Sequence, residues 1–341
     1  MIGCGSIAQA LHLPGYLRTP GVDLVAGCDP VPQRRKEAQR IAGTNCRVYE
    51  DHEEMLSAER LDVVSVATPN RFHAQHAIAA LEAGAHVLLE KPAALSMKEI
   101  EAIRRAVVKS GRQLIVGFSH RFQRGNRKIK RMLDAGVIGD PYMFRMRLAH
   151  RGPYPGWAKS DWFYDPQLAG AGAMLDMGIH AIDQALWLIG PVVAVQGKAG
   201  TLRKDIRVDD NALLLLEFEG GRTLGYIEVG WTSPAGFVGI EIMGDQGCII
   251  QNHAAGLTLT TGEVTPDAKK KPNLRTRLLD PKPTTGGWGV EVTDVVRALR
   301  RGEDLGSNID AGGAALAVAL AGFESSRTGK RVEVGKVRLA L

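Results

Sequence analysis

The stretch that decides the fold is Gly3-Cys4-Gly5-Ser6-Ile7-Ala8, at the start of the chain. It fits the pattern GxGxx(G/A), in which the first glycine permits a tight turn and the second lets the backbone approach a pyrophosphate. Ala8 would let the following helix pack close to a sheet, with its N-terminus facing the anion. Six residues of this form are weak evidence in a chain with 40 glycines. The interpretation as a phosphate-binding turn therefore needs support from the surrounding segments.

An acidic residue stands where a dinucleotide fold needs one. The apolar segment 23–28 predicts a strand that ends in Asp29, about two dozen residues beyond the turn. A carboxylate there can accept hydrogen bonds from both hydroxyls of an adenosine ribose, which favours NAD over NADP. Alternatively, Asp29 only begins an Asp29-Pro30 turn. Arg34 or Arg35 could reach a 2′-phosphate, so NADP stays possible.

The first third of the chain alternates short apolar runs with segments of helical spacing. Such alternation indicates right-handed βαβ crossovers and a parallel sheet covered on both faces. We therefore predict a Rossmann-type α/β domain over residues 1–120. The expected strands are 24–28, 63–67, 86–89 and 114–118, and the expected helices are 34–42, 73–83 and 96–109.

The strand that feeds the glycine turn is expected to be the central strand, and strands usually run about five residues. Only Met1 and Ile2 precede Gly3. We therefore expect a truncated first strand and a native chain that begins several residues upstream. An intact mass of the protein from its native source tests this expectation.

Residues 121–341 have a different pattern, which predicts an α+β domain on a large, mostly antiparallel open sheet. This second domain would bind the substrate and form oligomer contacts. Residues 261–283 are polar and rich in Pro and Lys, which favours a mobile surface loop. The other expected elements are helices at 126–135, 173–189, 290–300 and 311–327, a strand at 142–151, and successive strands over 192–259.

Composition narrows the class of protein. Hydrophobic residues make up 45% of the chain and charged residues 23%, which are ordinary globular values. The net charge is +6, but Lys and Arg are scattered among acids, and the basic runs 121–131 and 269–271 are not interleaved with aromatics. No apolar run reaches the roughly 18 residues that span a bilayer. The four cysteines show no CxxC spacing, which favours reduced thiols in a cytoplasmic protein. From the charge pattern and the short apolar runs we expect that the protein binds neither nucleic acid nor a membrane.

Three further segments carry chemistry-bearing residues. They are Thr68-Pro69-Asn70 with His73, Glu90-Lys91-Pro92, and a segment in which Gly170-Ala171-Gly172-Ala173 precedes Asp176, His180 and Asp183. In this order and spacing the chain resembles the Gfo/Idh/MocA family of oxidoreductases, which includes glucose–fructose oxidoreductase and inositol dehydrogenases. The resemblance covers essentially the whole chain. Many members have three successive glycines at the position of Gly170-Ala171-Gly172, a departure that could tighten the pocket.

The chemistry also follows from the residues. Lys91 is expected at the carboxyl end of a parallel strand, where open α/β sheets bind ligands, and its ammonium could steady a substrate oxygen as it becomes a carbonyl. Asp176, His180 and Asp183 fall at i, i+4 and i+7 on one helix face. His180 is suited to take the hydroxyl proton. Asp176 could bind a substrate hydroxyl or hold the imidazole, and Asp183 could orient His180.

Other interpretations of these residues exist. A lysine at a strand end commonly points into solvent, and a buried histidine is often only part of the packing. Asp176, His180 and Asp183 could clamp a cation, but the ammonium of Lys91 would oppose that charge, so we expect no metal. The aromatic residues Tyr154, Trp157, Trp162 and Tyr164 could form a wall against a sugar face or could simply pack.

The resemblance implies a set of site residues. Lys91, Asp176 and His180 are expected in the catalytic centre, with a cis Lys91–Pro92 bond, Trp162 near the cofactor and Arg121 facing the cleft. It also implies a homodimer or homotetramer. The full expected cofactor set is Gly3, Gly5, Ser6, Ile7, Asp29, Thr68, Asn70, His73, Glu90, Lys91 and Trp162. The expected substrate set is Lys91, Arg121, Tyr154, Trp157, Asp176 and His180.

The function implied is transfer of a hydride between the nicotinamide of NAD(P) and a hydroxyl carbon of a sugar, cyclitol or sugar acid. One alternative is an NAD-dependent glycosidase, in which transient oxidation permits elimination of a glycosidic substituent. Another is a non-catalytic regulator that senses NAD(P). The presence of Lys91, Asp176 and His180 argues against the regulator.

Overall fold

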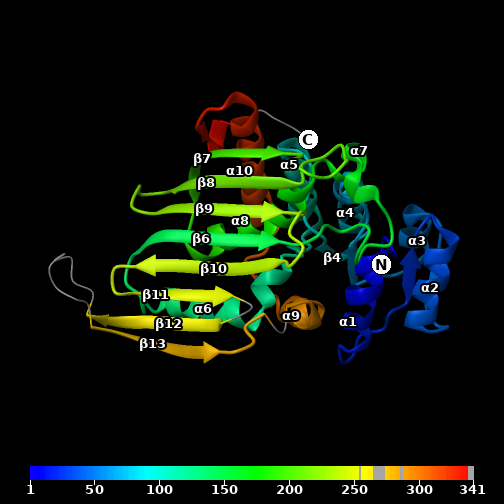
Figure 1. Ribbon diagram of the computed structural model, residues 1–341. Helices are drawn as coiled ribbons and strands as arrows, with labels where there is room; N and C mark the ends of the chain where they lie inside the picture. The colour runs from blue at the N-terminus through cyan, green and yellow to red at the C-terminus, as the bar shows by residue number, and fades with distance from the viewer. Residues whose placement is uncertain (253–254, 264–272, 285–286, 337–341) are drawn as a thin grey trace.

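The computed structural model describes residues 1–252, 255–263, 273–284 and 287–336 (Figure 1). Its N-terminal part is a parallel sheet flanked by helices. The five strands are β1 (Ala26–Cys28), β2 (Arg47–Tyr49), β3 (Val63–Val66), β4 (His86–Leu89) and β5 (Leu114–Val116). The helices are a π-helix (Ala8–His12), α1 (Leu13–Leu17), α2 (Pro32–Ala42), α3 (His52–Ala58), α4 (His73–Glu82) and α5 (Met97–Ser110), with 3-10 turns at Asn70–Phe72 and Ser119–Phe122.

Ile2 joins two groups of parallel strands into one sheet. It forms parallel bridges to Cys28 of β1 and to Val66 of β3. Its N–H donates to Ser65 O and its carbonyl accepts from Ala67 N, both at 2.8 Å. The strand order is therefore β2-β1-Ile2-β3-β4-β5, with the glycine turn leaving from the middle of the sheet. This is the Rossmann arrangement that the alternating pattern predicts.

The second part is built on a sheet of nine described strands in the order β13-β12-β11-β10-β6-β9-β8-β7-β14. Every pair is antiparallel except β6 with β9, so the predicted mostly antiparallel open sheet is confirmed. The strands are β6 (Pro141–Ala149), β7 (Val192–Gly200), β8 (Asn211–Phe218), β9 (Leu224–Gly230), β10 (Phe237–Gly244), β11 (Gly247–Asn252), β12 (Gly256–Glu263), β13 (Asn273–Asp280) and β14 (Val332–Glu333).

Helices cover one face of this sheet, and the face turned toward the viewer in Figure 1 carries no described helix. The helical elements are α6 (Arg124–Asp134), α7 (Pro166–Ala169), a π-helix (Met174–Gly178) that continues into α8 (Ile179–Leu188), α9 (Gly287–Arg301) and α10 (Ile309–Thr328), with 3-10 turns at Trp162–Tyr164 and Val334–Lys336. Among the described helices, none is long and apolar enough to span a membrane.

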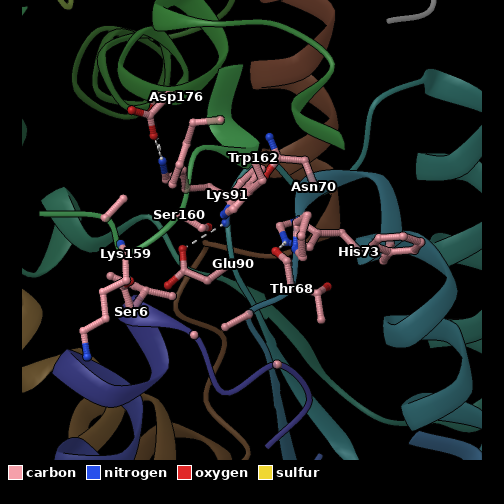
Figure 2. Close-up of a pocket in the computed structure, with 18 of the residues that line it drawn as sticks. Ser6, Thr68, Asn70, His73, Glu90, Lys91, Lys159, Ser160, Trp162 and Asp176 are labelled. Carbon is pink, nitrogen blue, oxygen red and sulfur yellow. Dashed lines mark hydrogen bonds and ion pairs between the residues drawn. The ribbon is translucent and has the colours of Figure 1, made fainter. Parts of the chain in front are cut away.

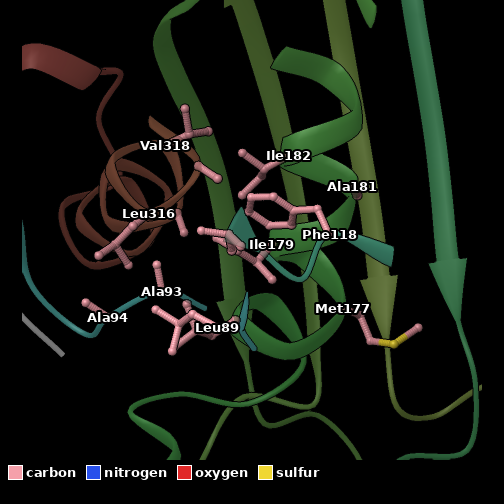
Figure 3. Packing of buried hydrophobic residues seen from close by; sticks show 14 of the residues in the cluster. Leu89, Ala93, Ala94, Phe118, Met177, Ile179, Ala181, Ile182, Leu316 and Val318 are labelled. Atoms are coloured by element: carbon pink, nitrogen blue, oxygen red, sulfur yellow. The ribbon is translucent and has the colours of Figure 1, made fainter. Parts of the chain in front are cut away.

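One hydrophobic cluster connects the two parts. Leu89 at the end of β4 and Phe118 after β5 are fully buried against α8 and α10 (Figure 3). The partners include Ile179 and Ile182 of α8 and Leu316 of α10. Burying each such side chain contributes about 1.5–3 kcal/mol. The cluster therefore fixes the end of β4 relative to the helix that carries His180.

Several predicted elements differ from the structure. The strand 86–89 is β4 with the expected bounds, and the other predicted strands and helices shift by a few residues. Neither β2 nor α3 was predicted. The prediction of a mobile loop over 261–283 is wrong, because β12 runs to Glu263 and β13 spans Asn273–Asp280. Most of β13 is exposed at the sheet edge, so it lacks the alternating burial that marks a strand. Residues 264–272 lie outside the described residues.

A buried carboxylate holds the start of the π-helix in place. Asp209 accepts hydrogen bonds from Gly172 N and Met174 N, each at 2.7 Å. A Cβ on Gly172 would lie 1.9 Å from Asp209 O, so only glycine fits without a shift of the backbone. This contact sets the position of Asp176, two residues further along the π-helix.

We predict that Gly172→Ala lowers the free energy of unfolding by about 1–3 kcal/mol, because the added methyl group displaces packed backbone. Urea denaturation followed by circular dichroism measures the change. Gly289→Ala is the matched control. Gly289 lies in α9 with no described atom within 4 Å of an added Cβ, so this variant should be neutral or more stable by up to about 1 kcal/mol. Equal behaviour of the two variants would contradict the prediction.

Candidate active site

A cavity of about 730 Å³ follows the carboxyl ends of the parallel strands and extends to the second sheet. It is lined by residues of both parts of the chain, and Figure 2 shows several of them. All eleven residues of the expected cofactor set lie on its wall. Of the expected substrate set, Lys91, Trp157, Asp176 and His180 line it, but Arg121 and Tyr154 do not.

The glycine turn has the geometry that its sequence predicts. Gly3 has φ +84°, and a Cβ there would lie 2.6 Å from Ala67 O. A Cβ on Gly5 would meet no described atom within 4 Å, so the backbone is open on that side. Asp29 is buried beneath the turn and accepts from Cys4 N and Val31 N, both at 2.9 Å. Asp29 therefore positions the turn, and its two carboxylate oxygens keep further lone pairs for a ligand.

Lys91 and Asp176 form an ion pair between the two parts of the chain. Lys91 Nζ donates to Asp176 Oδ1 at 2.6 Å and to the Asp176 carbonyl at 3.1 Å (Figure 2). Their side chains are only 16% and 9% exposed, so solvent screens the pair weakly. Trp231 Nε1 donates to the other oxygen, Oδ2, at 3.2 Å. The expected cis peptide bond between Lys91 and Pro92 is confirmed.

His180 lies buried at this end of the cavity and is uncharged at neutral pH. Burial, reinforced by His120 and Lys91, holds the pKa of His180 well below 6.5. Its ring stacks on that of His120 with centroids 4.5 Å apart and planes 11° apart. Burial and the charge of Lys91 also lower the pKa of His120, to about 4. Nδ1 of His180 is buried and has no hydrogen-bond partner among the described residues.

Asp183 does not orient His180, in contrast to the sequence-based expectation. It is fully buried and binds the guanidinium of Arg121, which donates from Nε and Nη2 at 2.6–3.1 Å. The remaining Nη1 of Arg121 donates to Gly306 O at 2.7 Å. The expectation that Arg121 faces the cleft is also wrong, because the fork of the guanidinium is occupied by the carboxylate. Arg121 lines a separate cavity beside Trp187.

The residues beneath Lys91 form a buried chain of hydrogen bonds. Glu90 Oε1 meets His12 Nε2 at 2.9 Å, and His12 Nδ1 meets Ser65 Oγ at 3.1 Å. Ser65 Oγ in turn meets the hydroxyl of Tyr16 at 2.6 Å. Burial raises the pKa of Tyr16 to about 12, so this hydroxyl stays protonated. This series of hydrogen bonds fixes the end of the strand that precedes Lys91.

Two predicted cofactor residues also anchor the loops around the cavity. His73 is buried with Nδ1 2.7 Å from Pro92 O and Nε2 2.9 Å from Thr68 O. Asn70 Nδ2 donates to Ala169 O at 2.9 Å, which connects the two parts of the chain. These contacts fix Thr68, which lines the cavity, and Pro92, which directly follows the lining residue Lys91.

The sequence analysis did not select several residues that line the cavity. His120 and His150 lie near Lys91, and His52 and His76 lie elsewhere on the cavity wall. Lys159 also lines it, and its N–H donates to Ser6 Oγ at 3.0 Å (Figure 2). In the sequence, His120 directly precedes Arg121, and Lys159 lies between Trp157 and Trp162. This closeness to selected residues was the one signal that could have identified them. Among the described residues, no group of three or more His, Cys, Asp and Glu side chains is placed to hold a metal ion.

Comparison with known proteins decides the family. The oxidoreductase family model with an NAD-binding Rossmann fold matches residues 1–118, and the GFO/IDH/MocA C-terminal domain model matches residues 126–250. The chain belongs to the Gfo/Idh/MocA oxidoreductase family. This confirms the resemblance that the glycine turn, Glu90-Lys91-Pro92 and the Asp176 to Asp183 segment indicate.

Similar proteins are named as dehydrogenases of different sugars and cyclitols. D-glucoside 3-dehydrogenase of Escherichia coli (strain K12) is 36% identical over 192 residues, which are 56% of this chain and 53% of that protein. Inositol 2-dehydrogenase 2 of Saccharopolyspora erythraea is 29% identical over 98% of this chain and 94% of its own length. A structure of levoglucosan dehydrogenase in complex with NADH and levoglucosan superposes with a TM-score of 0.82, at 26% identity and 98% coverage of each chain. The match therefore spans about half the length of the glucoside dehydrogenase but nearly all of the other two.

Proposed function

We propose that this chain is an NAD-dependent dehydrogenase that oxidises a hydroxyl carbon of a sugar, cyclitol or sugar acid, with NADP as the less favoured cofactor. The observation that carries the proposal is one cavity that holds both the glycine turn and the Lys91–Asp176–His180 group. The names of the relatives, which include inositol 2-dehydrogenase 2 and levoglucosan dehydrogenase, support the substrate class.

The residues present fit a nicotinamide dinucleotide. The open backbone at Gly5 and the helix that starts beyond it suit a pyrophosphate, and the buried carboxylate of Asp29 suits ribose hydroxyls. When bound, the nicotinamide supplies the acceptor for a hydride. We propose that residues 1–120 hold the dinucleotide and that residues 121–341 complete the substrate pocket.

The chain's own residues would handle the substrate oxygen and its proton. Lys91 Nζ, oriented by Asp176, would donate a hydrogen bond to the substrate oxygen as the carbonyl forms. As hydride leaves the carbon, the hydroxyl proton would pass to Nε2 of His180, because Nδ1 is buried. The low pKa of His180 keeps the ring neutral and able to accept that proton at pH 7. Trp157 and Trp162 would cover an apolar face of the substrate or cofactor.

We predict that NADH appears at 340 nm with at least one compound in a panel of sugars, inositols and sugar acids. Lys91→Met should then lower kcat/KM by about 100- to 1000-fold, because it removes the donor to the developing oxyanion. Lys198→Met is the control, since Lys198 is an exposed lysine of β7 outside the cavity. If no compound in the panel produces NADH although NAD binds measurably, the result would instead favour the glycosidase or the regulator. Release of a free sugar from glycosides would identify the glycosidase, and its absence would identify the regulator.

We predict that kcat/KM for oxidation stays constant as the pH falls from 8 to about 6. An ordinary histidine loses its basic form as the pH falls through 6.5, but the pKa of His180 lies well below that value. The base therefore remains deprotonated over this range. Initial rates with a substrate that does not itself titrate there, checked by circular dichroism for retained fold, measure the profile. A twofold loss centred near pH 6.5 would contradict the prediction.

We also propose a homo-oligomer that forms through the uncovered face of the large sheet. Leu213, Leu215 and Leu224 are 48%, 55% and 55% exposed on β8 and β9. Neighbouring apolar side chains of this kind commonly mark an interaction surface. Three free thiols, Cys4, Cys28 and Cys46, are buried, which suits a reducing compartment such as the cytoplasm, and cell fractionation tests that location.

We predict that light scattering with size exclusion finds a mass of at least two chains, and that Leu215→Glu shifts it toward one chain. A buried glutamate in an apolar interface would be strongly unfavourable. Val108→Glu is the control, because Val108 is 79% exposed on α5, away from this face. A wild-type protein that elutes as one chain at micromolar concentration would overturn the proposal.

A further inference from the structure

A second cavity, of about 530 Å³, takes no part in the proposed reaction. None of the described residues lines both this cavity and the candidate active site. Its wall comes from α6, α8, α9, the 3-10 turn after β5 and the segment 303–307. Pockets for small organic molecules commonly have volumes of about 300–1,000 Å³. The second cavity is therefore large enough for a ligand of its own.

The described lining of this cavity carries more positive than negative charge. Its guanidinium groups and carboxylates belong to Arg121, Arg127, Arg297 and Arg301, and to Asp294 and Glu303. Asp183, which does not line the cavity, offsets the charge of Arg121 from behind the wall. Four cations against three anions leave one positive charge in excess. The second cavity is thus suited to an anionic ligand.

Two of the arginines have donors to spare. Arg297 and Arg301 lie one turn apart on α9, so their side chains leave the same face of the helix. Arg297 Nη1 reaches Asp294 Oδ1 only at 3.5 Å, and Arg301 Nη1 lies 3.6 Å from Glu303 Oε1. Each contact uses one nitrogen of a guanidinium that has five N–H donors. The two arginine side chains are 60% and 68% exposed, so a ligand can reach the remaining donors.

The other two arginines are fixed in the wall of the cavity. Arg127 Nη2 donates to Asp294 Oδ2 at 2.7 Å, and its guanidinium carbon lies 5.0 Å from the ring centroid of Phe122. Arg121 is buried, and its guanidinium carbon lies 5.6 Å from the ring centroid of Trp187. Part of the charged wall is therefore held in position before a ligand arrives, which lowers the entropic cost of binding.

We infer that the second cavity is a ligand site separate from the candidate active site and that it takes a phosphorylated sugar. A phosphate monoester carries a charge of about −1.5 to −2 at pH 7, and the planar fork of an arginine matches its oxygens. The carboxylates of Asp294 and Glu303 can accept hydrogen bonds from sugar hydroxyls. The ring of Trp187 can pack against the apolar face of a sugar. A bare anion would use the arginines alone, whereas a phosphorylated sugar uses all three kinds of group.

The test measures binding to the whole chain by isothermal titration calorimetry, with hexose and pentose monophosphates, the same sugars without phosphate, and inorganic phosphate. We expect at least one sugar phosphate to bind about tenfold more tightly than its parent sugar and than inorganic phosphate. Arg297→Gln and Arg301→Gln should each weaken that binding about five- to tenfold, because each removes a charged donor to the phosphate. Glu303→Gln should instead strengthen it about twofold or more. This change removes a competing negative charge and keeps an oxygen that can accept from a hydroxyl.

Arg131→Gln is the matched control, because Arg131 is an exposed arginine of α6 that does not line the second cavity. Lys91→Met distinguishes the two cavities, since a sugar phosphate bound in the candidate active site would lose affinity in this variant and one bound in the second cavity would not. Arg297 and Arg301 are exposed, so their variants should fold, and circular dichroism checks this.

Three results would overturn the inference and leave the proposed function standing. The first is that no sugar phosphate binds more tightly than its parent sugar. The second is that inorganic phosphate binds as tightly as the best sugar phosphate, which would indicate a plain anion site. The third is that the affinity falls in Lys91→Met, or falls as much in Arg131→Gln as in the variants of Arg297 and Arg301.

Discussion

The ion pair between Lys91 and Asp176 is the interaction on which the site depends. It connects the end of β4 to the π-helix of the second part, so that two segments 85 residues apart share one short contact. Removing one member of a buried pair leaves an uncompensated charge and costs about 3–5 kcal/mol. The surrounding structure supports both partners. Glu90 and His12 hold the strand end, and Trp231 and the contact between Asp209 and Gly172 hold the helix.

The same pair sets the electrostatics of the reacting end. A charged ammonium next to buried imidazoles disfavours their protonation, so His120 and His180 stay neutral beside Lys91. One cation able to stabilise an oxyanion and one neutral base thus coexist in the same cavity. The carboxylate of Asp183 is instead bound by the guanidinium of Arg121. Asp176 and Asp183 look alike in sequence, but they pair with different cations, Lys91 and Arg121.

The sequence was sufficient for those features that depend on local pattern. The run 86–89 has three apolar residues after His86, and its predicted bounds are those of β4. The glycine turn and the spacing of Asp176 and His180 likewise predicted residues that line one cavity. Long-range partners could not be predicted. The spacing of Asp183 places it on the face of His180, but nothing local shows that Arg121, 62 residues earlier, occupies it. The strand β13 is exposed at an edge, so its burial pattern resembles a loop. His52 and His76 carry no motif, and only the packing of α3 on α4 brings their rings together.

Direct hydride transfer from the substrate carbon to the nicotinamide is the central claim, and an isotope experiment tests it most directly. A substrate found by the 340 nm assay is deuterated at the carbon to be oxidised and turned over with NAD⁺ in ordinary water. The account predicts one deuterium in each NADH by mass spectrometry, with none incorporated from D₂O in the reciprocal experiment. NADH without the label, or label released to the solvent, would contradict it.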